Sequence, residues 1–194
     1  MKRILLVIFV LTTTIHCISA QDMMLKTNLL YAGATFTPNI GAEIRLNSNF
    51  TLDLNGAYNP WNLKGSAESN KKLVHWMAQA ELRYYTCRSF DGHFFGVHLL
   101  ASQYNIIQRN LDFILGNDSE KYRFQGYGIG AGLSYGYQWV LSKNWSLEAT
   151  VGIGAMYLDF DKYECRTCGK QEGSETKIYL GPTRLGINLI YYIR

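Results

Sequence analysis

The sequence predicts an all-β chain, an eight-stranded antiparallel up-and-down transmembrane β-barrel. Three observations support this prediction: side chains alternate with period two along most of the chain, the composition is rich in aromatic residues and glycine, and the N-terminus is of the exported type. Aromatic residues make up 14% of the sequence, and 18 glycines stand beside only 3 prolines. Chains of this kind without helical periodicity are typical of β architectures with aromatic girdles.

Residues 1–20 have the organisation of a cleavable signal peptide. Lys2 and Arg3 precede an apolar run at residues 4–11, and the small residues Ser19 and Ala20 end the segment. The apolar run is too short for a transmembrane helix, which needs about 20 residues. We therefore expect cleavage after Ala20, leaving residues 21–194 as one barrel domain in the cell outer membrane.

Removing Lys2 and Arg3 lowers the formal net charge from +4 to +2. This balance gives no reason to expect a nucleic-acid partner, and no cofactor is expected either.

The clearest strand lies at residues 124–139. One face carries bulky side chains and the other is almost wholly glycine. The bulky set is Tyr127, Ile129, Ala131, Leu133, Tyr135, Tyr137 and Trp139, and the opposite set is Gly126, Gly128, Gly130, Gly132, Ser134, Gly136 and Gln138. A glycine face cannot form one wall of an apolar core, but it suits the inside of a narrow barrel, where side chains from other strands need room.

Seven further segments alternate or are strand-like. They are residues 25–32, 40–46, 50–58, 74–85, 93–102, 145–157 and 184–191, of which 25–32 and 93–102 are the least regular. Short turn-forming connections at residues 47–49, 87–92 and 142–144 alternate with longer links at 59–72, 103–123 and 161–176. The first link, around Thr37-Pro38-Asn39, is also short. Short turns on one rim and long loops on the other are typical of outer-membrane barrels.

The alternation alone does not say which face points inward. A soluble lipocalin-like ligand-binding barrel would have its apolar face inside. The glycine face must be the concave one, because the Tyr, Trp, Ile and Leu face opposite it is too bulky to fill a small lumen. Aromatic residues also end the apolar runs, as at Tyr58, Trp139, Trp145 and Tyr157, where interfacial belts are expected. Both features favour the membrane barrel over the soluble alternative.

Five sequence blocks resemble an uncharacterised family of outer-membrane β-barrel proteins, a domain of unknown function, from anaerobic Gram-negative bacteria. The blocks are Leu25-Lys26-Thr27-Asn28-Leu29-Leu30-Tyr31, Tyr58-Asn59-Pro60-Trp61, Gly92-His93-Phe94-Phe95-Gly96, Ser134-Tyr135-Gly136-Tyr137-Gln138-Trp139 and Leu180-Gly181-Pro182-Thr183. Members of the family are often encoded near fimbria genes. The resemblance therefore implies surface or fimbrial proteins as partners, but no activity.

The polar faces carry charges of both signs, which we expect to form an interior ion network. The residues are Glu43, Arg45, Asp53, Glu81, Arg83, Glu148 and Arg184. Such a network can be a polar conduit or a structural plug. An eight-stranded lumen is just wide enough for side chains to fill it, which favours the plug.

The exported chain retains three cysteines. Cys165 and Cys168 lie in the last long link, and Cys87 lies in a turn on the opposite rim. A zinc site would need a second pair of ligands, and a thioredoxin-like motif would need a strand–helix setting. We expect a disulfide between Cys165 and Cys168, since export leads to an oxidising compartment.

Two function classes remain. The first is a non-enzymatic barrel whose loops bind a surface partner or support envelope or fimbria-associated assembly. The second is a lipid-modifying enzyme, for which His75, His98 and Ser102 are the candidate groups near one rim. His98 and Ser102 are four residues apart, about 13 Å along a strand, so they cannot form a direct hydrogen bond. The sequence therefore favours the non-enzymatic class and assigns no catalytic or metal-binding residue.

Overall fold

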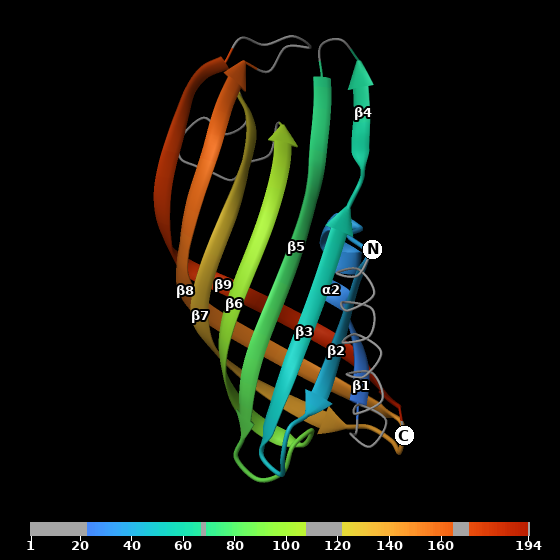
Figure 1. Cartoon of the computed structure of the whole chain (residues 1–194). Coiled ribbons are helices and arrows are strands. Elements are labelled where there is room, and N and C mark those ends of the chain that lie inside the picture. Colours follow the sequence, from blue (N-terminus) through green and yellow to red (C-terminus); the bar gives the residue numbers. More distant parts are fainter. Residues whose placement is uncertain (1–22, 67–68, 108–121, 165–170, 194) are drawn as a thin grey trace, which may run out of the picture.

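The computed structural model describes residues 23–66, 69–107, 122–164 and 171–193. In chain order its elements are β1 (Met23–Asn28), α2 (Leu29–Thr35), β2 (Asn39–Arg45), β3 (Phe50–Asn59), β4 (Asn62–Ser66), β5 (Ser69–Tyr85), β6 (Gly92–Ile107), β7 (Tyr122–Val140), β8 (Trp145–Glu164) and β9 (Gln171–Ile193). Figure 1 shows long strands that tilt around a common axis.

Eight strands form a closed antiparallel ring in up-and-down order. The hydrogen-bonded order is β3-β2-β1-β9-β8-β7-β6-β5-β4, and an additional pairing of β3 with β5 closes the ring. Strand β4 lies outside the ring and extends β3 along the edge of β5, with Asn62 opposite Lys72. The predicted all-β, eight-stranded, up-and-down architecture is confirmed.

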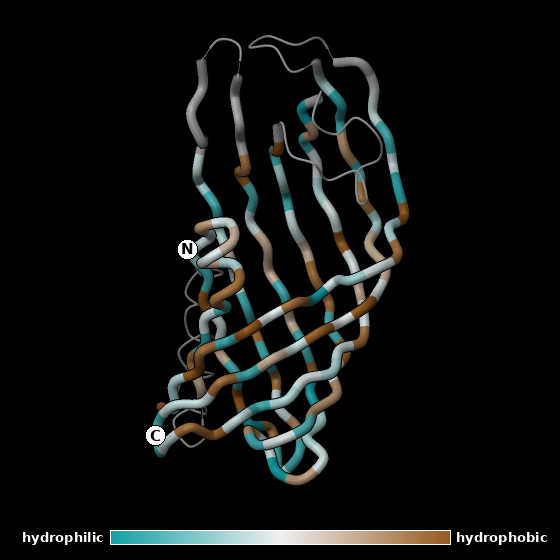
Figure 2. The backbone as a smooth tube through the Cα atoms, turned by 180° about the vertical axis from the view of Figure 1, so that it is seen from behind, coloured by the Kyte–Doolittle hydropathy of each residue, from teal (hydrophilic) through white to brown (hydrophobic). Residues whose placement is uncertain are grey.

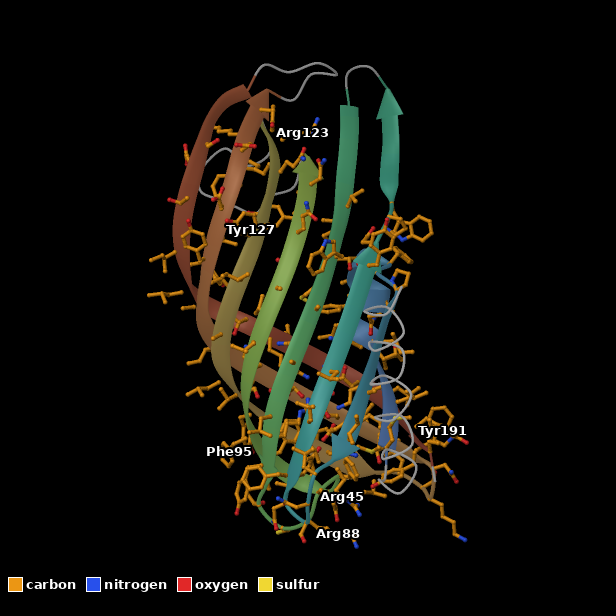
Figure 3. All side chains as sticks on the ribbon, viewed as in Figure 1. Arg45, Arg88, Phe95, Arg123, Tyr127 and Tyr191 are labelled. Atoms are coloured by element: carbon orange, nitrogen blue, oxygen red, sulfur yellow. The ribbon has the colours of Figure 1, made fainter. Side chains whose placement is uncertain are left out.

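The connections alternate as predicted. The turns after β2, β5 and β7 lie at one end of the ring, which we call the turn end. Backbone hydrogen bonds from Tyr85 to Asn49 (2.8 Å) and from Ser89 to Ser48 (2.8 Å) join the first two of these turns. Figure 3 shows Arg45 and Arg88 at this end and Arg123 toward the other, which we call the link end.

Three predicted boundaries are wrong. The long link predicted at residues 59–72 contains β4 and the start of β5 at Ser69. The strand predicted at residues 25–32 ends at Asn28, whose side chain accepts a hydrogen bond from the Leu30 N–H and caps helix α2. The long link predicted at residues 161–176 is largely strand, because β8 extends to Glu164 and β9 begins at Gln171. The added residues of β8 and β9 are polar on both faces, so they do not show the alternation from which strands were predicted.

The two faces of the sheet differ as the alternation predicts. Inward residues such as Glu43, Asp53 and Arg83 are fully buried, whereas outward Leu133 and Ile153 are 63% and 65% exposed. The inward glycines make room for neighbours: a Cβ on Gly132 would lie 2.8 Å from the His98 ring. Glycine on this face is thus a packing requirement of the narrow ring.

Three layers of side chains fill the inside of the ring. At the turn end, Met24, Phe90 and Ile190 pack together. Charged side chains form the middle layer. Toward the link end lies an apolar cluster, which we call the upper cluster, made of Tyr104, Phe124, Leu158, Phe160 and Tyr179.

Candidate functional site: a buried ion network

Three acidic side chains lie in a row on adjacent strands. The strand register places Glu43 opposite Asp53 and Asp53 opposite Glu81. All three are fully buried, and like charges directly opposite each other destabilise a sheet. The row therefore requires cations close by inside the ring.

Arg83 supplies the main compensation. Its guanidinium lies 2.8 Å from Glu43, 2.8 Å from Asp53 and 2.6 Å from Glu81. From the far wall, Glu148 binds it through two nitrogens at 2.7 and 3.2 Å. Arg83 also stacks over Phe94, with its Cζ 4.3 Å from the ring centre. One side chain thus joins four carboxylates from four strands, which the fork of an arginine can do and a lysine cannot.

Lys26 and Arg184 provide the remaining positive charges. Lys26 donates to Glu43 and lies 3.2 Å from both Asp53 and Glu148. Arg184 lies 2.7 Å from Asp53 and 3.2 Å from Glu81. We call these seven residues the ion network: Lys26, Glu43, Asp53, Glu81, Arg83, Glu148 and Arg184.

Neutral donors satisfy the outer oxygens of the carboxylates. Thr51 and Tyr85 donate to Glu43 at 2.6 and 2.9 Å, and Ser134 donates to Glu81. Thr150 and Asn188 donate to Glu148, each at 2.7 Å. Because buried charges are tolerated only when paired and hydrogen-bonded, this shell is what permits so many charges in a confined space.

The interior network predicted from the sequence contains Arg45 and does not include Lys26. Arg45 is half-buried nearer the turn end, where its guanidinium lies 3.4 Å from the Tyr192 hydroxyl and over the Phe90 ring at 4.9 Å. Lys26 was missed, although it alternates with Leu25 and Thr27 and so shares the inward face of β1 with Met24.

A hydroxyl and an imidazole meet at one margin of the network. Pro182 and Thr183 lie at a register shift between β8 and β9, and Thr183 Oγ1 is 2.9 Å from His98 Nε2. The other ring nitrogen of His98 is 4.0 Å from Glu81, beyond hydrogen-bonding distance. The predicted candidate Ser102 is half-buried four residues further along the same strand, and His75 is half-buried on β5.

The remaining predicted site residues are cysteines. Cys165 and Cys168 lie outside the described residues. Cys87 is a free, exposed cysteine in the turn after β5. Across the described ranges, no group of three or more His, Cys, Asp or Glu side chains is placed to hold a metal ion, and no helix there is long and apolar enough to cross a membrane.

Comparison with known proteins gives a family without an assigned activity. Residues 4–193 match the family described as "Protein of unknown function (DUF3575)". No curated protein matches the chain. The match covers nearly the whole sequence, and the chain therefore belongs to this family of unknown function.

Proposed function

We propose that this chain is a non-enzymatic outer-membrane β-barrel of a Gram-negative bacterium. The ion network closes its lumen, and its long extracellular loops serve surface binding or fimbria-associated assembly. The observation that carries the proposal is the inverted distribution of side chains. Charged groups fill the interior, while large apolar side chains cover the outside. A soluble lipocalin-like barrel has the opposite arrangement.

The height of the apolar surface supports insertion in a bilayer. Outward Tyr127 and Trp139 lie at the two ends of the apolar run of β7, and Trp145 and Tyr157 do the same on β8. Each pair is 12 residues apart, which is about 40 Å along a strand and about 30 Å along the axis of a tilted barrel. A hydrocarbon layer of about 30 Å would fit between these aromatic ends. Figure 3 shows Phe95 and Tyr191 near the turn end and Tyr127 further toward the link end.

A filled lumen supports a scaffold rather than a pore. The ion network and the apolar layers on either side of it leave no role for the interior as a wide water channel. Loops on a rigid scaffold are the usual place for binding, so we assign partner recognition to the links at the link end.

Two measurements test the proposal. The exported protein should fractionate with outer membranes and migrate faster on gels before heating than after it, as folded barrels do. In planar bilayers it should give no large, stable conductance. Recovery as a soluble periplasmic protein would contradict the membrane assignment, and reproducible porin-like channels would contradict the closed lumen.

A lipid-modifying enzyme is the second candidate, supported by the contact between His98 and Thr183. A hydroxyl 2.9 Å from an imidazole has the spacing of a nucleophile and its base. Release of fatty acid from phosphatidylcholine vesicles by the protein, lost in Thr183→Val, would support this candidate over the scaffold. The absence of any release would exclude hydrolysis of these lipids.

A further inference from the structure

Helix α2 stands where two strands of the ring end. Strand β1 pairs with β9 only as far as Asn28 opposite Asn188, and β2 pairs with β3 only as far as Asn39 opposite Ala57. Residues 29–38, which form α2 and the short link after it, connect these two ends. Figure 2 shows the coil of the helix next to the tilted strands that cross the lower half of the described molecule. Beyond Asn188, β9 has β8 as its only strand partner in the described chain, so one edge of its backbone has no ladder there.

The register of β1 and β2 predicts a second conformation for this connection. In an antiparallel ladder each step forward on one strand is a step back on the other, and here Lys26 lies opposite Gly41. Continued without a shift, the ladder places Ala32 opposite Thr35 and leaves a two-residue loop that begins at Gly33. Such a loop with glycine first is a type II′ turn, whose twist matches that of the strands it joins. The same residues can therefore form a β-hairpin that lengthens β1 and β2.

Gly33 fits the hairpin better than the helix. Glycine is among the least favourable residues in a helix interior, and a Cβ added to Gly33 would meet nothing within 4 Å. Packing around α2 therefore gives no reason for glycine at this position. The first loop residue of a type II′ turn needs a positive φ, which glycine adopts without strain.

The side chains also alternate as a hairpin requires. The buried residues of β1 have even numbers and those of β2 have odd numbers. If both strands continue, the outward positions are apolar or aromatic, and the inward positions except Leu30 are small or polar. The outward set is Leu29, Tyr31, Phe36 and Pro38, and the inward set is Leu30, Ala32, Thr35 and Thr37. Tyr31 and Phe36 would lie opposite each other as an aromatic cross-strand pair. The strand predicted from the sequence at residues 25–32 corresponds to the first arm of this hairpin.

The neighbouring strands are placed to receive the hairpin. On one side the Tyr58 N–H already donates to the Pro38 carbonyl at 3.1 Å, and these two residues are the next pair of the β2–β3 ladder. On the other side the backbone groups of outward Leu185 face the missing strand, where the β1–β9 register would place Tyr31. In the structure the Leu185 carbonyl instead accepts a hydrogen bond from the Asn28 side chain at 3.1 Å.

The helical conformation has both strain and support. Phe36, the residue that ends α2, has φ 49° in the left-handed region, where a bulky side chain is unfavourable. Seven residues are also too few for a helix that is stable by itself. The support comes from Asn59, which donates to the Thr35 carbonyl and the Thr37 hydroxyl at 3.1 and 2.8 Å, and from Trp61, whose indole donates to the Phe36 carbonyl at 2.7 Å. These contacts stabilise the helix, whereas the strain and the unpaired edge of β9 favour the hairpin.

We propose that residues 29–38 are a two-state gate in the wall of the ring. Helix α2 is one state, and a β-hairpin that pairs with β9 and β3 is the other. The hairpin closes the wall as far as Leu185, and the helix leaves this part open. The change also moves Tyr31. In the helical state its side chain lines a small inner cavity together with Arg184 of the ion network, with its hydroxyl 4.0 Å from the Met77 sulfur; in the hairpin it points outward. The gate thus controls access to the interior beside the ion network, and it does not depend on membrane insertion.

Two variants of the loop shift the gate in opposite directions. Gly33→Ala removes the glycine of the type II′ turn and stabilises the helix. Gly33→Asn combined with Ala34→Gly creates Asn-Gly, a strongly favoured two-residue hairpin loop, and weakens the helix. NMR of the exported chain in detergent micelles measures the ¹³C shifts of Tyr31 and the hydrogen-exchange rate of the Leu185 N–H. The alanine variant should show helical shifts and fast exchange. The Asn-Gly variant should show strand shifts and exchange slower by about tenfold or more, because the Leu185 N–H then has a strand partner.

Leu189 is the matched control, because it lies opposite Thr27 in both states. Its exchange rate should be the same in the wild type and in both variants. Helical shifts at Tyr31 with unchanged exchange at Leu185 in the Asn-Gly variant would overturn the proposal. If that variant does not fold, the wild type decides: relaxation dispersion on the μs–ms timescale should appear at Tyr31 and Leu185, be absent at Leu189 and disappear in Gly33→Ala. Flat profiles at Tyr31 and Leu185 in the wild type would then overturn the gate.

Discussion

The two halves of the ring have opposite interiors. In the half near the turn end every strand of the ring has two neighbours, and six of the seven ion-network residues lie there. The seventh, Arg184, is on the part of β9 that pairs with β8 alone in the described chain. In the other half β1 and β2 have stopped, and the interior is the apolar upper cluster. All of the network's charges except that of Arg184 are thus buried where the backbone ladder is continuous, whereas the upper cluster lies where it is not. In the proposed membrane position, a charged cluster behind an open wall would face hydrocarbon, at a cost of several kcal/mol for each unpaired ion.

The largest expected effect comes from removing the centre of the ion network. Arg83→Met leaves four buried carboxylates with two cations, Lys26 and Arg184, and should lower the free energy of unfolding by about 3–5 kcal/mol. Urea unfolding of the folded protein in detergent or lipid measures the loss.

A second substitution tests whether this loss is electrostatic. Adding Glu148→Gln to Arg83→Met restores the wild-type excess of one carboxylate, so the double variant should recover much of the lost stability. A double variant less stable than Arg83→Met would show that Arg83 acts through packing, such as its contact with Phe94, and not through charge.

An outward substitution probes the surface of the same wall. Leu133 is 63% exposed near the middle of the apolar run of β7, and Leu133→Arg should destabilise the protein in a bilayer by about 2–4 kcal/mol. Leu133→Ala is the control for lost side-chain volume. Equal stability of the two variants in lipid would contradict the membrane position of this surface.

Adjacent positions on β7 test the packing inside. Gly132 faces inward against His98, and Ala131 faces outward. Gly132→Val should cost about 1–3 kcal/mol because the added side chain overpacks the interior. Ala131→Val should change the free energy of unfolding by less than about 0.5 kcal/mol, as an unconstrained surface position does. If Ala131→Val lowered the free energy of unfolding more than Gly132→Val did, the assignment of inward and outward faces on β7 would be wrong.

Period-two alternation was sufficient to predict the faces of the sheet and the inward charges. The alternation could not predict which charged residues pair with each other. The contact between Arg83 and Glu148, for example, depends on the strand register across the whole ring. Lys26 was missed because its strand is short and continues into an apolar helix. Helix α2 was missed because seven residues span too few turns to show a helical period.

The smallest effect concerns the start of helix α2. Asn28 caps α2 and also binds the Leu185 carbonyl. Asn28→Ala should therefore cost about 1 kcal/mol, the usual loss for a helix cap. Hydrogen exchange should show the loss as faster exchange in α2, with unchanged rates at the turn end. Faster exchange throughout the ring would indicate that the two halves unfold as one unit.

The central claim is that the charged face of the sheet is inside and the apolar face lies in lipid. Single cysteines at each position from Tyr127 to Gln138, with Cys87, Cys165 and Cys168 replaced by serine, can be spin-labelled in vesicles. Power saturation with oxygen and with a water-soluble nickel chelate then reports the surroundings of each label. The account predicts period-two alternation, with Ile129, Ala131, Leu133 and Tyr135 accessible to oxygen and shielded from nickel. Strong nickel accessibility at those four positions would place the apolar face in water and contradict the account.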